Sequence, residues 1–332
     1  MKNMPLMDKT TASPRVSIIL CFYNEERYLK LSIDSILAQT YKDFELIIVN
    51  DGSSDGSEKI VKSYNDPRIV YHTYEKNRRL AYARNRGLEL ARGEYVGFFD
   101  ADDIMEKDKT EKQVRFLDEH SEITVVGGAF SYMDAEGNTD TDVTLPMYTE
   151  DLDIRAHMLF GNCMWVGSAL FRKGILDKHG ITLDESNKAS EDYRLWTDMM
   201  PYARFAYIND RVYYYRVNHG SKATLIVNKD TSAYDREISG ILKAAWSGRG
   251  FKLGENDIEF IRKYLFENKR TLSPSSLHQK NVTLRKIKKQ LSELELPEGE
   301  LILKEYKKAW ACAFHTYWIL KKLTGKKENG RI

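Results

Sequence analysis

The sequence predicts an α/β protein built on a doubly wound sheet, followed by a helical region. Short apolar runs alternate with segments of helical periodicity from Pro14 to about Gly128, which is the pattern of repeated strand–helix–strand units. From about Thr231 onward the periodicity is helical, with breaks at LSPSSL and LPEGE. With 332 residues, of which 42% are hydrophobic, the chain is long enough to bury a full core.

The alternating segment contains four expected strands with a helix between each pair. The first strand is a continuous apolar run, VSIILCF, which suits burial on both faces of a parallel sheet. The helices have apolar residues three or four positions apart, on one face. The expected elements, in order, are a strand from Val16, a helix with Leu29, Ile33, Ile36 and Leu37 on one face, a strand at 45–50, a helix from its cap Ser57 to Tyr64, a strand at 68–74, a helix marked by Leu80, Ala83, Gly87 and Leu90, and a strand at 94–99.

Beyond these elements the alternation weakens. We expect a hairpin around Asp134 to Asn138, a helix near Glu191 to Met199 and a second hairpin through RVYYYRVN at 211–218. The helical periodicity that follows is expected to begin at a boundary near 229–234.

Three segments are therefore expected: a disordered N-terminus at 1–13, an α/β domain at 14–230 and a basic helical region at 231–332. The charges differ between the two ends of the chain. From Arg262 onward there are 17 basic and 7 acidic residues, whereas the preceding residues comprise 34 basic and 42 acidic ones.

Polar residues follow three of the expected strands at the point where each strand ends. Ligands of doubly wound sheets bind beyond the carboxyl ends of the strands, so these loops are the first place to look for a site. The residues concerned are Tyr23, Asn24 and Glu25 after the first strand, Asp51 to Asp55 after the second, and Asp100 to Asp103 after the fourth. We expect the three loops to meet at one rim.

The stretch VGFFDADDIM places Asp100, Asp102 and Asp103 directly after an apolar strand. Like charges this close repel one another, so a cation or hydrogen bonds must hold such a cluster. Mg²⁺ and Mn²⁺ take one or two protein carboxylates and complete their shells with water and phosphate oxygens. An isolated D-x-D is more often a solvated turn or a helix cap. Its position on a shared rim favours a metal-bound phosphate ester instead.

The loop NDGSSDGS, from Asn50 to Ser57, also follows a buried strand. Its glycines let backbone approach a ligand closely, and the carboxylate of Asp51 can accept a hydrogen bond from a nucleobase. The serines are equally explained as an ordinary turn and helix cap. No G-x-G-x-x-G and no G-x-x-x-x-G-K-[ST] occurs, so the dinucleotide and P-loop phosphate cradles are not indicated.

Four motifs in this order, VSIILCFYNEERYL, ELIIVNDGSSDGS, NRRLAYARNRGLELARGEYVGFFDADD and SEDYRLW, resemble the family 2 inverting glycosyltransferases of the GT-A fold. The resemblance spans roughly Pro14 to Thr224. It implies a nucleoside diphosphate sugar as donor, with uracil as the usual base, Mn²⁺ or Mg²⁺ as cofactor, and a glycan or lipid-linked acceptor in surface polysaccharide or lipopolysaccharide synthesis. No QxxRW follows the ED pair and no membrane helices flank the motifs, so transfer of a single sugar is expected rather than processive polymerisation.

The resemblance also implies roles for individual residues. Asp192, with Glu191 beside it, occupies the position of the family's catalytic base. The implied metal ligands are Asp100, Asp102 and His219. The implied nucleotide contacts are Tyr23, Asn24, Glu25, Asp51, Asn77, Arg84, Asp100, Ala101, Arg216, His219 and Ser221.

Two positions depart from the family pattern. The residue before Asp51 is asparagine, where an acidic residue is common, and Arg79 stands where a glycine is common. The first departure is mild because Asp51 remains. The second either changes the loop geometry or adds a phosphate contact.

The last part of the chain has two interpretations. An amphipathic stripe of Leu303, Tyr306, Trp310, Ala313, Phe314 and Tyr317 is surrounded by Lys304, Lys307, Lys308, Lys321 and Lys322. Such a stripe fits the surface of an anionic membrane, which would suit a lipid-linked acceptor. Packing on the α/β domain or on a second subunit of a homo-oligomer is the more frequent fate of such stripes and is favoured here.

Other features limit location and partners. No secretory signal and no apolar run of membrane-spanning length is present, so we expect a cytoplasmic protein, peripheral on the inner face of the membrane if the stripe binds lipid. Three widely spaced cysteines predict neither disulfides nor a zinc site. No nucleic-acid-binding motif is found. A sugar-1-phosphate nucleotidyltransferase, which should have a glycine-rich loop where FYNEE stands, and an inactive carbohydrate-binding or scaffolding protein are the alternative functions.

Overall fold

The computed structural model describes residues 13–139, 142–146, 148–217, 231–266 and 274–307 of the chain. Within these residues the strands form one eight-stranded sheet in the order β3-β2-β1-β4-β7-β6-β8-β5. The strands are β1 Val16–Phe22, β2 Phe44–Asn50, β3 Ile69–Thr73, β4 Tyr95–Asp100, β5 Ile104–Met105, β6 Val125–Met133, β7 Leu170–Arg172 and β8 Phe205–Arg216. The helices are α1 Leu29–Leu37, α2 Ser57–Lys62, α3 Leu80–Leu90, α4 Lys109–Glu119, α5 Asp151–Met158, α6 Gly174–His179, α7 Glu191–Met199, α9 Thr231–Gly248, α10 Glu255–Phe260 and α11 Pro274–Leu294, with a 3-10 turn at Val166–Ser168 and a π-helical turn at Ile261–Phe266.

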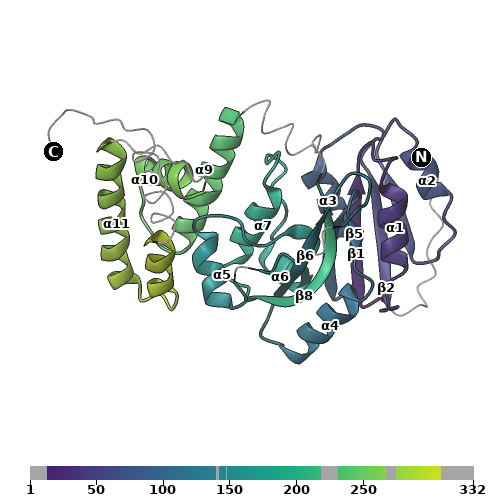
Figure 1. The fold of residues 1–332 in the computed structure, drawn as a ribbon, viewed down its shortest axis with the longest axis horizontal. Helices are drawn as coiled ribbons and strands as arrows, with labels where there is room; N and C mark the ends of the chain where they lie inside the picture. The colour runs from purple at the N-terminus through teal and green to yellow at the C-terminus, as the bar shows by residue number, and fades with distance from the viewer. Residues whose placement is uncertain (1–12, 140–141, 147, 218–230, 267–273, 308–332) are drawn as a thin grey trace.

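The sheet is parallel in one half and mixed in the other. Strand β1 pairs in parallel with both β2 and β4, and β3 continues the parallel half beyond β2. Strand β7 runs antiparallel between β4 and β6, and β8 is parallel to β6. The expected doubly wound, mixed α/β sheet with a helical region after it is therefore confirmed (Figure 1).

Alternate residues of β1 point into two hydrophobic layers, because successive side chains of a strand face opposite sides of the sheet. Ile18 and Leu20 pack in one layer with residues of α1, α2 and α4. Ile19 and Cys21 pack in the other with residues of α3, α5, α7 and the C-terminal helices. Both faces of the central strand are therefore covered, which explains the uninterrupted apolar run in its sequence.

The expected hairpin at 211–218 is wrong, because its described residues belong to one long strand. β8 pairs with β6 along one edge and with the short β5 along the other. Gly128 pairs with Ile208, but the next residue of β6 pairs with Arg211, so residues 209 and 210 form a bulge. The other expected hairpin is present, since Met133 bridges Thr139 in antiparallel fashion.

The N-cap expected at Ser57 is also wrong. Helix α2 begins at Ser57 itself, with Gly56 at the cap position. The backbone N–H of Ser57 donates to Oδ1 of Asp55, at 3.0 Å, and the Ser57 hydroxyl accepts the backbone N–H of Glu25 instead, at 2.9 Å. The carboxylate two residues earlier thus does the capping.

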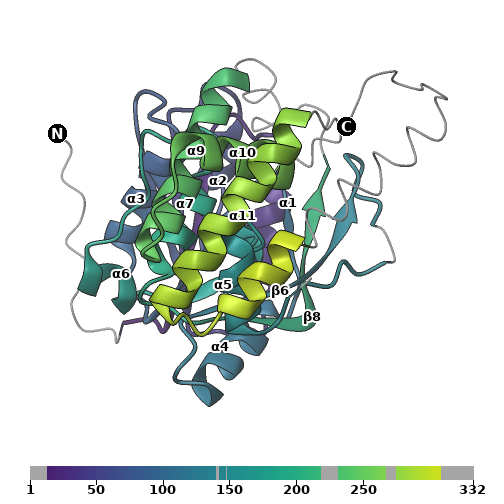
Figure 2. The ribbon, with the colours of Figure 1, turned by 90° about the vertical axis from the view of Figure 1, so that its left-hand side faces the viewer.

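The C-terminal helices pack directly on the α/β part (Figures 1 and 2). Trp246 of α9 is fully buried and its indole N–H donates to the carbonyl of Leu159, at 2.7 Å. Tyr306 is also fully buried, with its ring centroid 6.3 Å from that of Phe160. The beginning of the amphipathic stripe therefore lies in the core, as the packing interpretation expects, while its part from Trp310 onward lies outside the described residues. Among the described helices, none is both long and apolar enough to cross a membrane.

Candidate active site

A buried arginine joins two of the sequence motifs. Arg84, on α3, has a side chain that is 3% exposed and donates from one Nη to Oδ1 of Asp100, at 2.8 Å, and from the other to Oε1 of Glu191, at 2.7 Å. Burial alone would lower the pKa of Arg84, but the two carboxylates raise it above its ordinary value. The guanidinium is therefore a permanent cation between the end of β4 and the start of α7.

The sequence suggested a direct contact between Arg84 and a nucleotide. In this structure both Nη groups point to protein carboxylates, and that contact stays a prediction. The planar guanidinium of Arg84 can donate to two carboxylates at the same time, and it thereby holds both acids in fixed positions.

Asp192 lies in the first turn of α7 and is partly exposed. Its Oδ2 accepts a hydrogen bond from the side-chain amide of Asn162, at 3.1 Å, and its Oδ1 accepts the backbone N–H of Tyr193, at 2.6 Å. Burial raises its pKa to about 7 and neighbouring Glu191 adds to this, while Arg84 opposes it. A carboxylate with this pKa can accept a proton near neutral pH, which a general base must do.

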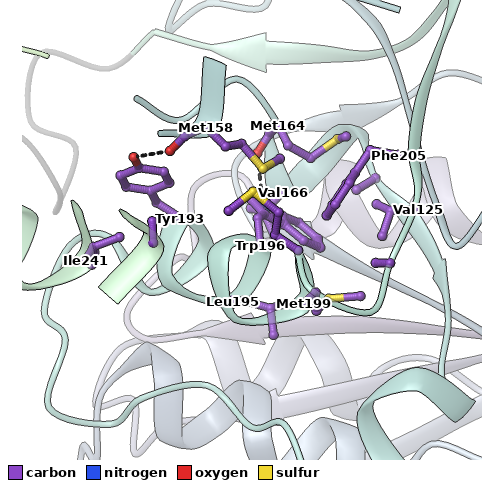
Figure 3. Close-up of a cluster of buried hydrophobic side chains, with 14 of the residues drawn as sticks. Val125, Met158, Met164, Val166, Tyr193, Leu195, Trp196, Met199, Phe205 and Ile241 are labelled. Carbon is purple, nitrogen blue, oxygen red and sulfur yellow. Dashed lines mark hydrogen bonds between the residues drawn. The ribbon is translucent and has the colours of Figure 1, made fainter. Parts of the chain in front are cut away.

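The helix that holds Asp192 is anchored in the core below it (Figure 3). The Tyr193 hydroxyl donates to the carbonyl of Met158, at 2.7 Å, and the indole N–H of Trp196 donates to the carbonyl of Met164, at 2.8 Å. Both side chains are fully buried. The first turn of α7 is therefore presented by a rigid helix rather than by a loop.

The loop after β2 is bonded to the loop before α3. The two carboxylate oxygens of Asp51 accept the backbone N–H groups of Arg78 and Arg79, at 2.7 and 2.8 Å, and Asp51 is 3% exposed. In this structure the carboxylate shapes the neighbouring loop, and its contact with a nucleobase stays a prediction. Asn77, at the tip of that loop, is exposed.

Arg79 keeps a backbone conformation suited to glycine. Its φ of 79° and ψ of 164° lie in a region that is essentially restricted to glycine. Arg79 thus adopts a glycine-like backbone conformation at this position, and its side chain is exposed.

The loops after β1 and β2 are also bonded to each other. The backbone N–H of Asn24 donates to the Ser53 hydroxyl, at 2.9 Å, and the side-chain oxygen of Asn24 accepts the backbone N–H of Ser54, at 2.8 Å. Asn24 has a φ of 54°, which asparagine tolerates better than most residues. Tyr23, Asn24 and Glu25 are all partly exposed at this rim.

The acidic loop after β4 has an inward and an outward side. Asp103 is 1% exposed, and its Oδ1 accepts the backbone N–H of Arg216, at 2.8 Å. No group among the described residues donates to its buried Oδ2. Burial, followed by repulsion from Asp102 and Asp100, raises the pKa of Asp103 well above its ordinary value. Asp100 and Asp102 are partly exposed, whereas Ala101 between them is buried.

Arg216 braces this loop from β8. Its Nε donates to the backbone carbonyl of Asp102 and one Nη to that of Asp134, at 2.7 and 2.8 Å, and its guanidinium lies 4.3 Å from the ring centroid of Tyr28. Arg216 is 3% exposed, so its predicted phosphate contact stays a prediction. His219 and Ser221 lie outside the described residues.

A helix of the C-terminal region reaches the site, which the sequence did not indicate. The Glu237 carboxylate, on α9, accepts the backbone N–H groups of Lys188, Ala189 and Ser190, at 2.9, 3.2 and 2.8 Å. It thus supplies acceptors just before the first turn of α7. From the sequence alone, Ser190 would be expected to cap α7 with its own side chain. No sequence pattern links Ser190 to Glu237, which lies 47 residues later.

The outward carboxylates fit a hard divalent cation. Among the described residues, no group of three or more His, Cys, Asp or Glu side chains is arranged to hold a metal ion. Mg²⁺ and Mn²⁺ sites of phosphate-binding enzymes commonly use only one or two carboxylates and obtain other oxygens from the phosphates and water. Asp100 and Asp102 provide such a donor set.

Comparison with known proteins identifies relatives of this chain. A model of the family described as glycosyl transferase family 2 matches residues 17–180. The chain is 34% identical over 241 residues to an uncharacterized glycosyltransferase of Rickettsia typhi, an alignment that covers 71% of this chain and 74% of that protein.

Two solved structures share the fold. S. aureus TarS (residues 1–349) in complex with UDP-GlcNAc has a TM-score of 0.63 and 19% identity, covering 96% of this chain and 94% of that one. The mannosyltransferase PcManGT of Pyrobaculum calidifontis, in complex with GDP-Man and Mn²⁺, has a TM-score of 0.53 and 17% identity, covering 93% and 88%. At these identities the likeness concerns the fold, and it confirms the expected GT-A architecture.

Proposed function

The chain belongs to glycosyl transferase family 2 and is a glycosyltransferase, and from this premise we propose a specific reaction for it. The enzyme is inverting and metal-dependent, and it transfers one sugar from a nucleoside diphosphate sugar to a hydroxyl group of a glycan or lipid-linked acceptor. The observation that carries this proposal is the contact of Arg84 with both Asp100 and Glu191, because it links the acidic loop proposed to hold the metal to the residue beside the proposed base.

Asp192 is the proposed general base. Its pKa of about 7 allows it to be ionised in a large fraction of molecules near neutral pH and to take the proton of the acceptor hydroxyl. Asn162 orients the carboxylate through Oδ2. The deprotonated oxygen attacks the anomeric carbon opposite the departing diphosphate, and one displacement inverts the configuration at that carbon.

Asp100 and Asp102 are the residues that would hold Mn²⁺ or Mg²⁺. When bound, such an ion neutralises negative charge that develops on the leaving diphosphate. Arg84 keeps Asp100 in place, and Arg216 holds the backbone of Asp102. These two arginines would limit the movement of the acidic loop during donor binding.

The rim loops after β1 and β2 form most of the proposed nucleotide site, with Tyr23, Asn24, Glu25 and Asp51 as contacts, and Asn77 after β3 and Ala101 after β4 complete it. UDP is the expected nucleotide. Because the two similar structures were solved with different nucleotide sugars, UDP-GlcNAc and GDP-Man, the fold itself does not select the base. We place the enzyme in the cytoplasm, in surface polysaccharide or lipopolysaccharide synthesis.

Calorimetric titration with UDP, GDP and dTDP, with and without Mn²⁺, tests the donor class. We expect metal-dependent binding of one nucleotide to the wild type and no such binding to Asp102→Ala. Asp177→Ala is the matched control, because this exposed acid of α6 forms an ion pair with Lys173, the residue just before that helix. Failure of the folded wild type to bind any of the three would overturn the transferase assignment of this site and favour a scaffolding protein.

A further inference from the structure

A cluster of aromatic rings lies at the mixed half of the sheet. Trp165 is 42% exposed and Tyr132 is 40% exposed, which is unusual for side chains of this size. The ring centroid of Trp165 is 5.2 Å from that of Phe130 and 5.4 Å from that of Tyr215, and Tyr132 lies 6.1 Å from Tyr215. We call the rings of Trp165, Tyr132 and Tyr215 the aromatic platform.

The peptide group between Met164 and Trp165 is held at both of its polar atoms. The N–H of Trp165 donates to the Tyr207 hydroxyl, at 3.2 Å, and the carbonyl of Met164 accepts the indole N–H of Trp196. The exposed indole is therefore presented by a fixed segment, in contrast to a side chain at the tip of a loose loop. A fixed, exposed aromatic ring loses little conformational freedom when a ligand covers it.

The platform lies beside both catalytic elements. Asn162, three residues before Trp165, hydrogen-bonds Asp192. On the other side, Tyr215 precedes Arg216, whose backbone N–H bonds Asp103. Burial raises the pKa of Tyr215 to about 12, and the charges of Asp103, Asp100 and Asp102 contribute to this, which agrees with a ring close to the acidic loop.

The position in the sheet separates the platform from the nucleotide. The rim loops proposed to bind the nucleotide follow β1 and β2, in the parallel half. Phe130 and Tyr132 belong to β6 and Tyr215 to β8, beyond β4 and β7. A molecule on the platform is therefore on the acceptor side of the reacting centre.

We propose that the aromatic platform binds the acceptor, and that the acceptor is a sugar ring whose apolar face stacks on Trp165. This inference rests on the proposed function and names its acceptor class. A pyranose ring has C–H groups on one face and hydroxyl groups at its edge. The aromatic rings match the C–H face, and Asn162 with Asp192 can receive a hydroxyl at the edge. An alkyl chain would use the rings but has no hydroxyl group to offer to Asp192.

Saturation-transfer NMR with octyl β-D-glucopyranoside below its micelle concentration tests the class of occupant. The probe contains a sugar ring and an alkyl chain, so the protons that receive saturation identify the part that contacts the protein. We expect ring protons to dominate. Saturation confined to the octyl chain would overturn the proposal in favour of a lipid surface, and no saturation at millimolar probe would overturn it altogether.

Variants assign the signal to the platform. We expect ring-proton saturation to fall about fivefold in Trp165→Ala, as loss of one stacking contact predicts, and to be largely kept in Trp165→Phe. Tyr202→Ala is the control, since Tyr202 is 52% exposed and stacks on His179, away from the platform. An unchanged signal in Trp165→Ala would contradict the assignment.

The test is independent of the proposed donor. Trp165→Ala should still bind the nucleotide in calorimetry, because Trp165 belongs to the acceptor side. If wild-type protein binds no nucleotide but its platform binds the sugar ring, the transferase proposal fails and the platform remains. If nucleotide binds and the sugar ring does not, only the acceptor inference fails.

Discussion

The parallel and mixed halves of the sheet build their parts of the site in different ways. In the parallel half, the polar residues lie directly after strands, and neighbouring loops bond one another, as Asp51 does with Arg78 and Arg79. In the mixed half, Asp192 depends on Asn162, 30 residues earlier, and on a helix start held by Glu237. The nucleotide side is thus shaped by bonds between neighbouring strand-end loops up to 30 residues apart, whereas the base also depends on Glu237, which lies 47 residues after Ser190 in the C-terminal region.

Arg84 joins the two halves, and its loss should have the largest effect. Arg84→Met leaves the carboxylates of Asp100 and Glu191 without their cation, and the carboxylate of Glu191 is nearly buried. We therefore expect the free energy of unfolding to fall by about 3–5 kcal/mol. Urea denaturation measures this. Arg86→Met, which removes an exposed pair with Glu89 on the same helix, should cost about 0.5 kcal/mol or less. Similar losses in both variants would show that the buried contact does not join the halves.

Glu237 tests whether the C-terminal region positions the base. Glu237→Ala removes the acceptor of three N–H groups, and we expect a loss of about 1–2 kcal/mol together with faster hydrogen exchange at Ser190. The turnover rate of sugar transfer should fall while nucleotide affinity stays unchanged, because the nucleotide loops are in the other half. Glu255→Ala is the control, as this residue is 80% exposed in a pair with Lys243. A weakened nucleotide affinity in Glu237→Ala would contradict the division.

Asp192 gives a smaller effect that depends on pH. Its folded-state pKa of about 7 lies above the unfolded value of about 3.9, so its contribution to stability is complete below about pH 4 and is lost as pH rises through about 7. Asp192→Asn cannot titrate, and we expect it to lose less stability than the wild type between pH 4 and pH 8. Thermal unfolding at both pH values measures the difference, roughly 2–4 °C. The activity of the wild type should rise with pH through about 7. If the stability of Asp192→Asn depended on pH in the same way as that of the wild type, the pKa of Asp192 would not be raised.

Arg79 should give the smallest effect, confined to the parallel half. Arg79→Gly relieves a backbone conformation that suits glycine, but it also increases the freedom of the unfolded chain. We expect a net gain in stability of about 1 kcal/mol or less, seen as a higher unfolding temperature. Arg79→Ala keeps the Cβ atom and removes the charge, so this variant should not be more stable than the wild type. If both variants were more stable, the cause would be loss of the charge rather than relief of backbone strain.

Much of the parallel half could be predicted from the sequence. The strands from Val16 and at 45–50 were expected within one residue of β1 and β2, because strands buried on both faces are continuous apolar runs between polar loops. Helix α7 was expected at its observed bounds from its amphipathic period. The second hairpin was wrong, because the pattern at 211–218 does not reveal that these residues continue a long strand, and only the pairing of β8 with β6 decides this.

The sequence by itself determined the fold class, the family and the order of the polar loops, because strand and helix periodicity and strand-end motifs are local properties of the chain. Only the tertiary structure decided that Arg84 bonds Asp100 and Glu191, that Glu237 caps the segment before α7, and that Trp165 is exposed. These contacts join residues as much as 107 positions apart. A hydrogen bond requires atoms within about 3 Å, and for distant residues that proximity is set by the packing of the whole core rather than by sequence spacing.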